Sequence, residues 1–304
     1  MGFYFFFLSV GLCNATIRSL NEDMEDPILS HLLLADECLL DARRVNIFER
    51  AIKESVNPHS VVVDAGTGTG IMAMIAARAG AKKVYALEID SGIAEMARDS
   101  IKKAGYKDVI TVLNCNVKDF SLPNNKSADV LNMELLDTGL ISEHQTTAIL
   151  ALRKNRVIDD HTIFIPHRVT SSVRLIFYDF NFYGFELPII IQARNFKATK
   201  NIQNIMSSFV IYSDVDLRNI NTQEVKSKIE IPVDSDGEIN ACELTTDVYL
   251  SNRRYAATTD MNMPVIIPTK LLKVKKGDII EININYQMSK GFETFSLLTC
   301  KKDK

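Results

Sequence analysis

A run of β-branched residues that enters a glycine-rich turn constrains the fold of this chain more than any other feature. Residues 61–70 read VVVDAGTGTG, and an Ala- and Met-rich stretch of helical character follows over Ile71–Ala79. A buried strand joined to a helix by such a turn is typical of doubly wound α/β folds, which bind ligands at the ends of their strands. Glycines in the turn allow the backbone to approach a ligand closely, because no Cβ intervenes.

Further strands and helices alternate with this first unit before residue 134. Helical periodicity runs through residues 27–57 and stops at Asn57-Pro58. The other predicted elements are strands at Lys83–Ile89, Val109–Leu113 and Ala128–Met133 and a helix at Ile93–Ala104. Alternation at this spacing predicts a parallel, doubly wound sheet.

The pattern changes after Pro166, where strand-like segments separated by turn signals replace the alternation. These segments are Val169–Phe177, Ser207–Tyr212, Thr245–Tyr249 and Asp278–Tyr286, with a turn at Lys276-Gly277-Asp278. We therefore predict three regions: an apolar N-terminal tail over residues 1–26, an α/β domain over 27–166 and a mostly β domain over 167–304.

Charge and cysteine content exclude several classes of function. The chain has 35 Lys and Arg against 38 Asp and Glu, so no global field attracts it to nucleic acid or anionic membranes. The lysines at 273, 275 and 276 are interpreted as a solvated hairpin. The five cysteines are scattered and never form a C-x-x-C pair, which argues against disulfides and zinc. We predict a cytoplasmic protein without metal ligands.

The N-terminal segment Phe3–Cys13 is apolar for about eleven residues, with no basic residue before it, and is too short to span a bilayer. Three interpretations remain open. The segment is an apolar tail that precedes a true start at Met24, a packed first element or a weak signal sequence.

Two acids flank the predicted ligand site. Asp64 precedes the first glycine in a D-x-G-x-G-x-G pattern, where a carboxylate can meet the amino group of a methionyl moiety and would repel a pyrophosphate. Glu88 ends the next strand, twenty-two residues after Gly66, where it can accept both ribose hydroxyls. NAD would also use an acid like Glu88. Asp64 and the acceptor loop described next favour S-adenosylmethionine.

The fourth predicted strand leads into the loop ELLDTGLISE, in which Glu134 and Glu143 lie nine residues apart. In this loop the chain resembles the protein arginine methyltransferases, whose acceptor loop carries two glutamates at that spacing, and it is most similar to their type III, monomethylating branch. Glu134 directly follows a buried strand at the ligand-binding edge of the predicted sheet. The resemblance implies that both glutamates are catalytic.

The resemblance extends over nearly the whole chain beyond residue 27. It includes Ala79-Gly80-Ala81 and Ile165-Pro166-His167-Arg168, and it places Arg44 where the family binds the cofactor carboxylate. It implies a Rossmann-type class I methyltransferase domain followed by a C-terminal β-barrel-like domain, and a homodimer formed through an arm such as Phe182–Ile191. The predicted cofactor-binding residues are Arg44, Asp64, Gly66, Thr67, Gly68, Gly70, Glu88 and Val117.

A pair of acids suits the chemistry of arginine methylation. A guanidinium stays protonated in proteins and presents a planar fork of donors that carboxylates bind bidentately. Two glutamates can hold both edges, draw positive charge from the attacking nitrogen and align it, and either can help to remove a proton. The implied partner is a protein with an exposed arginine.

The chain departs from the family at two places. The residues Thr259-Asp260-Met261-Asn262 stand where the family has a Thr-His-Trp loop, and the chain contains no tryptophan. Asp260 occupies the position of the histidine, and Phe48 stands in place of tyrosines of the N-terminal helix. His144, beside Glu143, is either polar surface or part of the acceptor pocket. A small-molecule or RNA acceptor and a non-enzymatic activating subunit therefore remain alternatives.

Overall fold

The computed structural model describes residues 37–123, 126–192, 197–251, 254–256 and 263–302. The apolar N-terminal segment, the alternative start at Met24 and the altered loop at Asp260 lie outside these residues. The predictions made for them therefore stay predictions.

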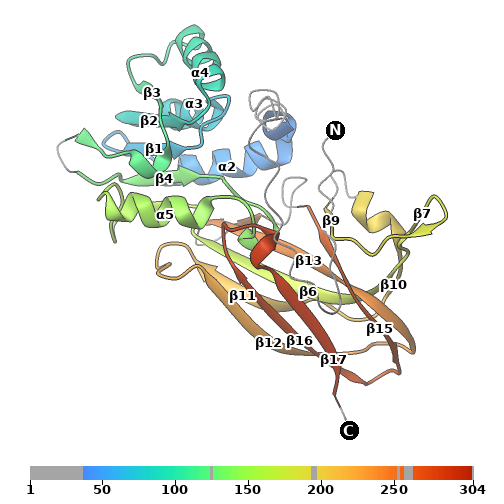
Figure 1. The fold of residues 1–304 in the computed structure, drawn as a ribbon. Coiled ribbons are helices and arrows are strands. Elements are labelled where there is room, and N and C mark those ends of the chain that lie inside the picture. The colour runs from blue at the N-terminus through green and yellow to red at the C-terminus, as the bar shows by residue number, and fades with distance from the viewer. Residues whose placement is uncertain (1–36, 124–125, 193–196, 252–253, 257–262, 303–304) are drawn as a thin grey trace.

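The first part of the described chain is a five-stranded parallel sheet in the order β3-β2-β1-β4-β5. Figure 1 shows α3 and α4 on one side of this sheet and α5 on the other. The elements are α2 (Ala42–Ser55), β1 (Val61–Ala65), α3 (Ile71–Arg78), β2 (Lys83–Glu88), α4 (Ser91–Lys103), β3 (Ile110–Asn114), β4 (Val130–Met133), α5 (Gln145–Lys154) and β5 (Ile163–Ile165). The predicted doubly wound α/β fold is confirmed.

Apolar residues in the central strands explain why this sheet lies at the centre of its layers. Val62, Val63, Val84 and Val130 are fully buried, as expected for parallel strands that are covered on both faces. The register brings Asp64 on β1 beside Asn132 on β4. The carboxyl ends of β1, β2 and β4 therefore meet at one edge of the sheet, where α/β folds bind ligands.

The second part consists of antiparallel strands in two main sheets and one hairpin. A seven-stranded sheet contains the path β10-β6-β13-β15-β9, with β11 paired to β6 and β14 to β13, and a second sheet has the order β12-β16-β17. The strands are β6 (Arg168–Tyr178), β7 (Asn181–Phe182), β8 (Phe185–Glu186), β9 (Ile191–Gln192), β10 (Ile202–Ile205), β11 (Val210–Asp216), β12 (Glu224–Pro232), β13 (Gly237–Ser251), β14 (Arg254–Ala256), β15 (Val265–Val274), β16 (Ile279–Gln287) and β17 (Ser296–Lys301).

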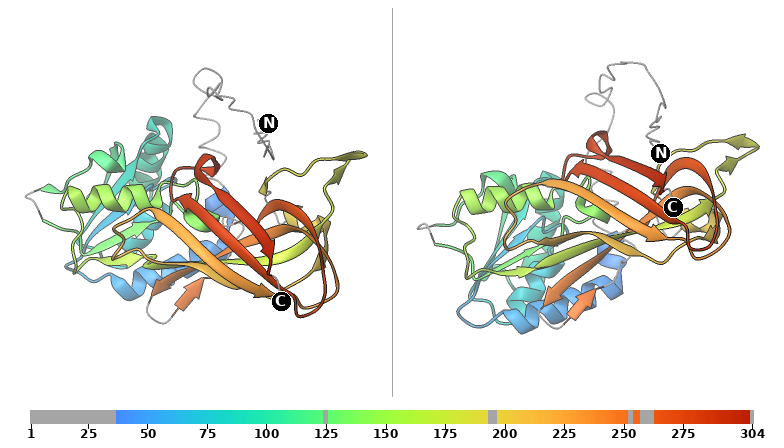
Figure 2. Two further views of the ribbon diagram at one scale, coloured as in Figure 1. Left: turned by 60° about the horizontal axis from the view of Figure 1, so that its bottom comes forward. Right: turned by 90° about the horizontal axis from the view of Figure 1, so that it is seen from below.

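The two main sheets close around a shared core. Strand β12 contacts β11 at one edge and β17 contacts β15 at the other, which confirms the predicted barrel-like second part. The β7–β8 hairpin projects from this body in both views of Figure 2. The last parallel strand ends at Ile165 and the first antiparallel strand begins at Arg168. These bounds support the domain division that we propose at residue 166.

Several strand limits differ from the prediction for identifiable reasons. The segment predicted from Ser207 becomes a strand only at Val210, because the buried Ser207 hydroxyl accepts a hydrogen bond from the Leu175 N–H at 2.9 Å. The short strand predicted over Thr245–Tyr249 is part of the much longer β13. None of the helices in the described residues combines the length and the hydrophobicity of a membrane span.

Candidate functional site

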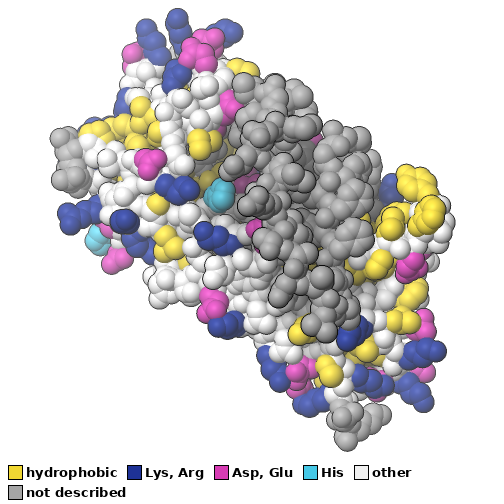
Figure 3. Space-filling model, viewed as in Figure 1, with side chains coloured by type: hydrophobic (Ala, Val, Ile, Leu, Met, Phe, Trp, Pro, Cys, Tyr) yellow, Lys and Arg dark blue, Asp and Glu magenta, His cyan; other side chains and the backbone are white. Residues whose placement is uncertain are grey.

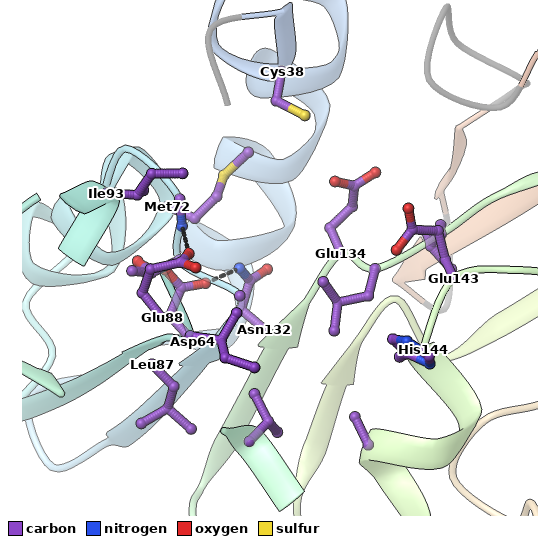
Figure 4. Close-up of a pocket in the computed structure, with 18 of the residues that line it drawn as sticks. Cys38, Asp64, Met72, Leu87, Glu88, Ile93, Asn132, Glu134, Glu143 and His144 are labelled. Atoms are coloured by element: carbon purple, nitrogen blue, oxygen red, sulfur yellow. Dashed lines mark hydrogen bonds between the residues drawn. The ribbon is translucent and has the colours of Figure 1, made fainter. Parts of the chain in front are cut away.

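A pocket of about 540 Å³ opens at the carboxyl ends of β1, β2 and β4. Figure 4 shows the acids of this pocket arranged from the glycine-rich turn to the loop after β4. The predicted site residues that line it are Arg44, Asp64, Gly66, Thr67, Gly68, Glu88, Val117, Glu134 and Glu143. The structure therefore brings together residues from distant parts of the sequence, as predicted.

Gly70 is the predicted site residue that does not line this pocket. A Cβ at Gly70 would lie 3.2 Å from the Ile101 side chain, because this glycine begins α3 close to α4. Gly66, in contrast, lines the pocket with a φ of +76°, and a Cβ there would lie 2.7 Å from Leu135. Gly70 thus contributes helix packing, whereas Gly66 forms part of the pocket wall.

Asp64 holds the glycine-rich turn against the neighbouring strand. Its Oδ2 accepts a hydrogen bond from the Thr67 hydroxyl at 2.5 Å, and its Oδ1 accepts one from the Asn132 side-chain amide at 2.6 Å. Burial raises the pKa of the Asp64 carboxyl, and these hydrogen bonds oppose that shift. Asn132 was not among the predicted site residues, and its only signal in the sequence is its position near the end of a buried strand.

Glu88 connects the turn with the start of α4. Its Oε2 accepts the Gly68 N–H at 2.9 Å and its Oε1 accepts the Asp90 N–H at 3.0 Å. A carboxylate has about four acceptor positions, so two remain for the hydroxyls of a ligand. Val117, in the short helical turn Val117–Asp119, lines the pocket further along the sheet edge.

Arg44 lies between the turn and the acceptor loop. Asp41 caps α2 by accepting the Arg44 backbone N–H at 2.9 Å, which fixes the start of the helix. The Arg44 Nη2 donates to Glu134, and its Nη1 donates to the Cys38 carbonyl at 3.0 Å. The buried Nε has no hydrogen-bond partner within the described structure, so its N–H remains for a ligand.

The second group of acids consists of Glu134 and Glu143. Figure 4 shows their carboxylates directed into the same space, on the opposite side of the pocket from Glu88. Burial raises the pKa of the Glu134 carboxyl; Arg44 opposes this shift, and the negative charge of Glu143 adds to it. Two carboxylates that face the same space repel each other, and a positive charge between them stabilises both.

The backbone on both sides of Glu134 and before Glu143 is held by buried side chains. The Gln145 amide accepts the Leu135 N–H at 2.8 Å and donates to the Met133 carbonyl at 3.0 Å. The Asp137 carboxylate accepts the Ser142 N–H at 2.8 Å, and burial raises the pKa of Asp137 to about 7. Neither Gln145 nor Asp137 was among the predicted site residues.

Two further side chains, Cys38 and His144, line the pocket, and Phe48 packs against Arg44 behind them. Burial raises the pKa of the Cys38 thiol to about 11, so this thiol stays protonated at neutral pH. His144 lines the pocket, and burial together with Lys118 and Lys290 lowers its pKa. Phe48 packs beneath Arg44, whose Cζ lies 5.6 Å from the ring centre. The described residues contain no cluster of side chains that could hold a metal ion.

The polar groups of this pocket fit S-adenosylmethionine. Glu88 offers acceptor positions for paired ribose hydroxyls. The unpartnered Arg44 Nε is a buried donor that suits a carboxylate, because a buried polar group without a partner is unfavourable. Glu134, which pairs with Arg44, and Glu143 lie across the pocket from Glu88 and outside this set.

Comparisons with known sequences show that the chain is similar to methyltransferases. The family model described as ribosomal protein L11 methyltransferase (PrmA) matches residues 46–152. An uncharacterized protein of Methanocaldococcus jannaschii is 32% identical over 260 residues, which cover 85% of this chain and 93% of that protein. Protein arginine N-methyltransferase 1 of Oryza sativa is 31% identical over 174 residues, which cover 53% of this chain and 44% of that protein. The chain thus spans about half the length of this named relative.

Solved structures show the same fold over almost the whole chain. The PRMT1 enzyme-prozyme heterotetrameric complex of Trypanosoma brucei with AdoHcy matches with a TM-score of 0.71 and 18% identity, covering 90% of this chain and 98% of that one. Protein arginine methyltransferase 10 of Arabidopsis thaliana matches with a TM-score of 0.70 and 18% identity, covering 90% and 98%. Both the α/β part and the barrel-like part therefore have counterparts.

Proposed function

This chain belongs to the protein arginine methyltransferase family and is an S-adenosylmethionine-dependent enzyme, and we propose that its methyl acceptor is the guanidinium of an arginine in a protein. The observation that carries this proposal is the pair of carboxylates, Glu134 and Glu143, facing one space in the cofactor pocket. A neutral acceptor would not require two acids there, and an RNA polyanion would be repelled by them.

The cofactor part of the pocket would hold S-adenosylmethionine through two charged residues. When bound, this cofactor supplies an electrophilic methyl group on a sulfonium sulfur. Glu88 would accept its ribose hydroxyls, and the Arg44 Nε would donate to its carboxylate. Asp64 keeps the turn closed through Thr67 and Asn132, so the backbone stays near the ligand.

The acceptor part would hold and orient the guanidinium. Glu134 and Glu143 would bind its two edges through charge-assisted hydrogen bonds and hold one nitrogen in line for attack. Positive charge drawn toward the carboxylates leaves that nitrogen more nucleophilic. Because burial raises the pKa of Glu134, this carboxyl group is suited to accept the proton that the nitrogen loses.

Methyl transfer to matched peptides tests the acceptor. The wild-type chain, incubated with labelled S-adenosylmethionine, should label an arginine-rich peptide and leave a lysine-substituted copy unlabelled. Equal labelling of the two peptides would reject arginine as the acceptor. The number of methyl groups per arginine tests the type III branch, which stays a prediction, as does the cytoplasmic location.

Replacing Glu88 by alanine should weaken S-adenosylmethionine binding by about 1–3 kcal/mol, because charged hydrogen bonds to the ribose would be lost. Isothermal calorimetry measures this change directly. Glu95→Ala is the control, because Glu95 is exposed on α4 and pairs with Arg98 outside the pocket. Unchanged affinity in the Glu88 variant would reject its assignment to the ribose.

We propose that the chain forms a homodimer through the β7–β8 hairpin. Tyr183 is 99% exposed at the turn and Phe185 is 70% exposed, which is unfavourable for aromatic rings in water. Figure 3 shows hydrophobic side chains gathered over this projecting hairpin. Changing both residues to serine should convert a dimer into a monomer at micromolar concentration, as measured by light scattering. A monomeric wild-type protein would contradict the proposal.

A further inference from the structure

The loop that carries Glu134 and Glu143 is attached to the barrel at its midpoint. The short helical turn Thr138–Leu140 contacts β6 and β13, and Figure 1 shows this green segment against those strands. The loop begins in the α/β part, yet its central residues are fully buried by strands of the second part. The position of the two acids therefore depends on contacts outside the cofactor domain.

Gly139 is held by hydrogen bonds to both of its backbone polar groups. Its N–H donates to the Thr246 hydroxyl on β13 at 2.8 Å, and its carbonyl accepts from the Tyr286 hydroxyl on β16 at 2.7 Å. Ser171 on β6 extends this contact through a 3.0 Å hydrogen bond to Thr246. All of these side chains are almost completely buried, so water does not replace the hydrogen bonds.

The space around Gly139 leaves little freedom for the loop to shift. Its φ is +77°, a conformation that other residues adopt only with strain, and a Cβ would lie 2.9 Å from the Tyr212 hydroxyl. The Thr138 hydroxyl also donates to the Met263 carbonyl at 2.5 Å. Glu143 lies four positions after Gly139, so a displacement at this point would be transmitted to the second acid.

We propose that Thr246 and Tyr286 are positioning residues that hold Gly139 and thereby set Glu143 against Glu134 for methyl transfer. This inference rests on the proposed function, because it assigns a role to the same pair of acids. Neither hydroxyl belongs to the pocket lining, so their effect on catalysis passes through the loop. Misplacing a reacting group by about 1 Å commonly reduces the rate by about a hundredfold.

The variants Thr246→Val and Tyr286→Phe test the proposal, because each removes one hydroxyl while keeping size. We expect kcat for an arginine peptide to fall about tenfold or more, with cofactor affinity changed less than about twofold. Thr246→Ser should recover most of the activity, since it restores the hydroxyl. Tyr178→Phe is the matched control, because Tyr178 is a buried tyrosine on β6 that packs in a separate cluster.

Hydrogen exchange measured by mass spectrometry over residues 134–143 provides a second readout that needs no methyl acceptor. Exchange should become faster in both test variants and stay unchanged in Tyr178→Phe. Wild-type kcat together with unchanged exchange in Thr246→Val would overturn the positioning role. If the wild-type enzyme labels no arginine peptide, the proposed acceptor is wrong. Hydrogen exchange then still tests the contact with Gly139. Faster exchange in the two test variants supports that contact, and unchanged exchange rejects it.

Discussion

Glutamine at either Glu134 or Glu143 should reduce turnover on an arginine peptide by about 10²–10³-fold, the usual effect of removing one electrostatic partner of a transition state. The substitution keeps the size of the side chain and most of its hydrogen-bonding capacity, and it removes one negative charge. Because both acids face the same space, each is expected to be required. Initial rates of methyl transfer from labelled S-adenosylmethionine measure the loss.

Cofactor affinity separates this effect from damage to the pocket. Calorimetry should give nearly the same S-adenosylmethionine affinity for the Glu143→Gln variant and the wild type, because Glu143 lies on the acceptor side. Glu95→Gln is the control for an acid outside the pocket. Wild-type rates in both glutamine variants would remove the main support for arginine as the acceptor.

The cofactor half of the site was largely predictable from the sequence, because its residues follow from strand ends. Three apolar runs predicted β1, β2 and β4, and parallel strands place their carboxyl ends together. Asp64, Glu88 and Glu134 each stand at such an end, so their proximity needed only the order of elements. The structure confirms that they line one pocket.

The supporting residues were not predictable, because their roles depend on partners far away in the sequence. Asn132 is a single polar residue in an apolar strand, and Gln145 is one of several polar residues at the start of α5. Only the folded chain shows what they bind. Arg44 was placed in the site by family resemblance, and its pairing with Glu134 across ninety positions of sequence had no local signal. The attachment of Gly139 to Thr246 likewise joins the α/β part to the barrel-like part.

The β character of the second part was predicted, but the limits of its strands were predicted less accurately. Strand β13 runs over Gly237–Ser251, but charged residues interrupt its alternation of apolar and polar side chains. Glu243 illustrates the reason: it is 3% exposed and pairs with Arg174 on β6 at 2.5 Å. A buried charge can occupy a core position when a partner neutralises it, and the sequence alone does not reveal that partner.

The buried pair Arg44–Glu134 should give the largest effect on stability. Its side chains are 7% and 9% exposed, and removing one partner of a buried pair typically costs about 3–5 kcal/mol. We expect Arg44→Met to destabilise the fold by about that amount in urea unfolding, because methionine keeps the packing on Phe48 and leaves Glu134 without its cation. The double variant with Glu134→Gln should recover much of the loss.

The pH dependence identifies the uncompensated carboxylate as the cause. An acid whose pKa is raised by folding contributes stability below its unfolded pKa, and this contribution is lost as the pH rises through the folded pKa. Burial already raises the pKa of Glu134, and removing Arg44 takes away the group that opposes this shift. The loss in free energy of unfolding of Arg44→Met relative to the wild type should therefore grow from pH 5 to pH 8. The alternative cause is lost packing of the arginine side chain. It would be shown by a loss in free energy of unfolding that is constant over this pH range, or that is equal in Arg44→Met and in the double variant with Glu134→Gln.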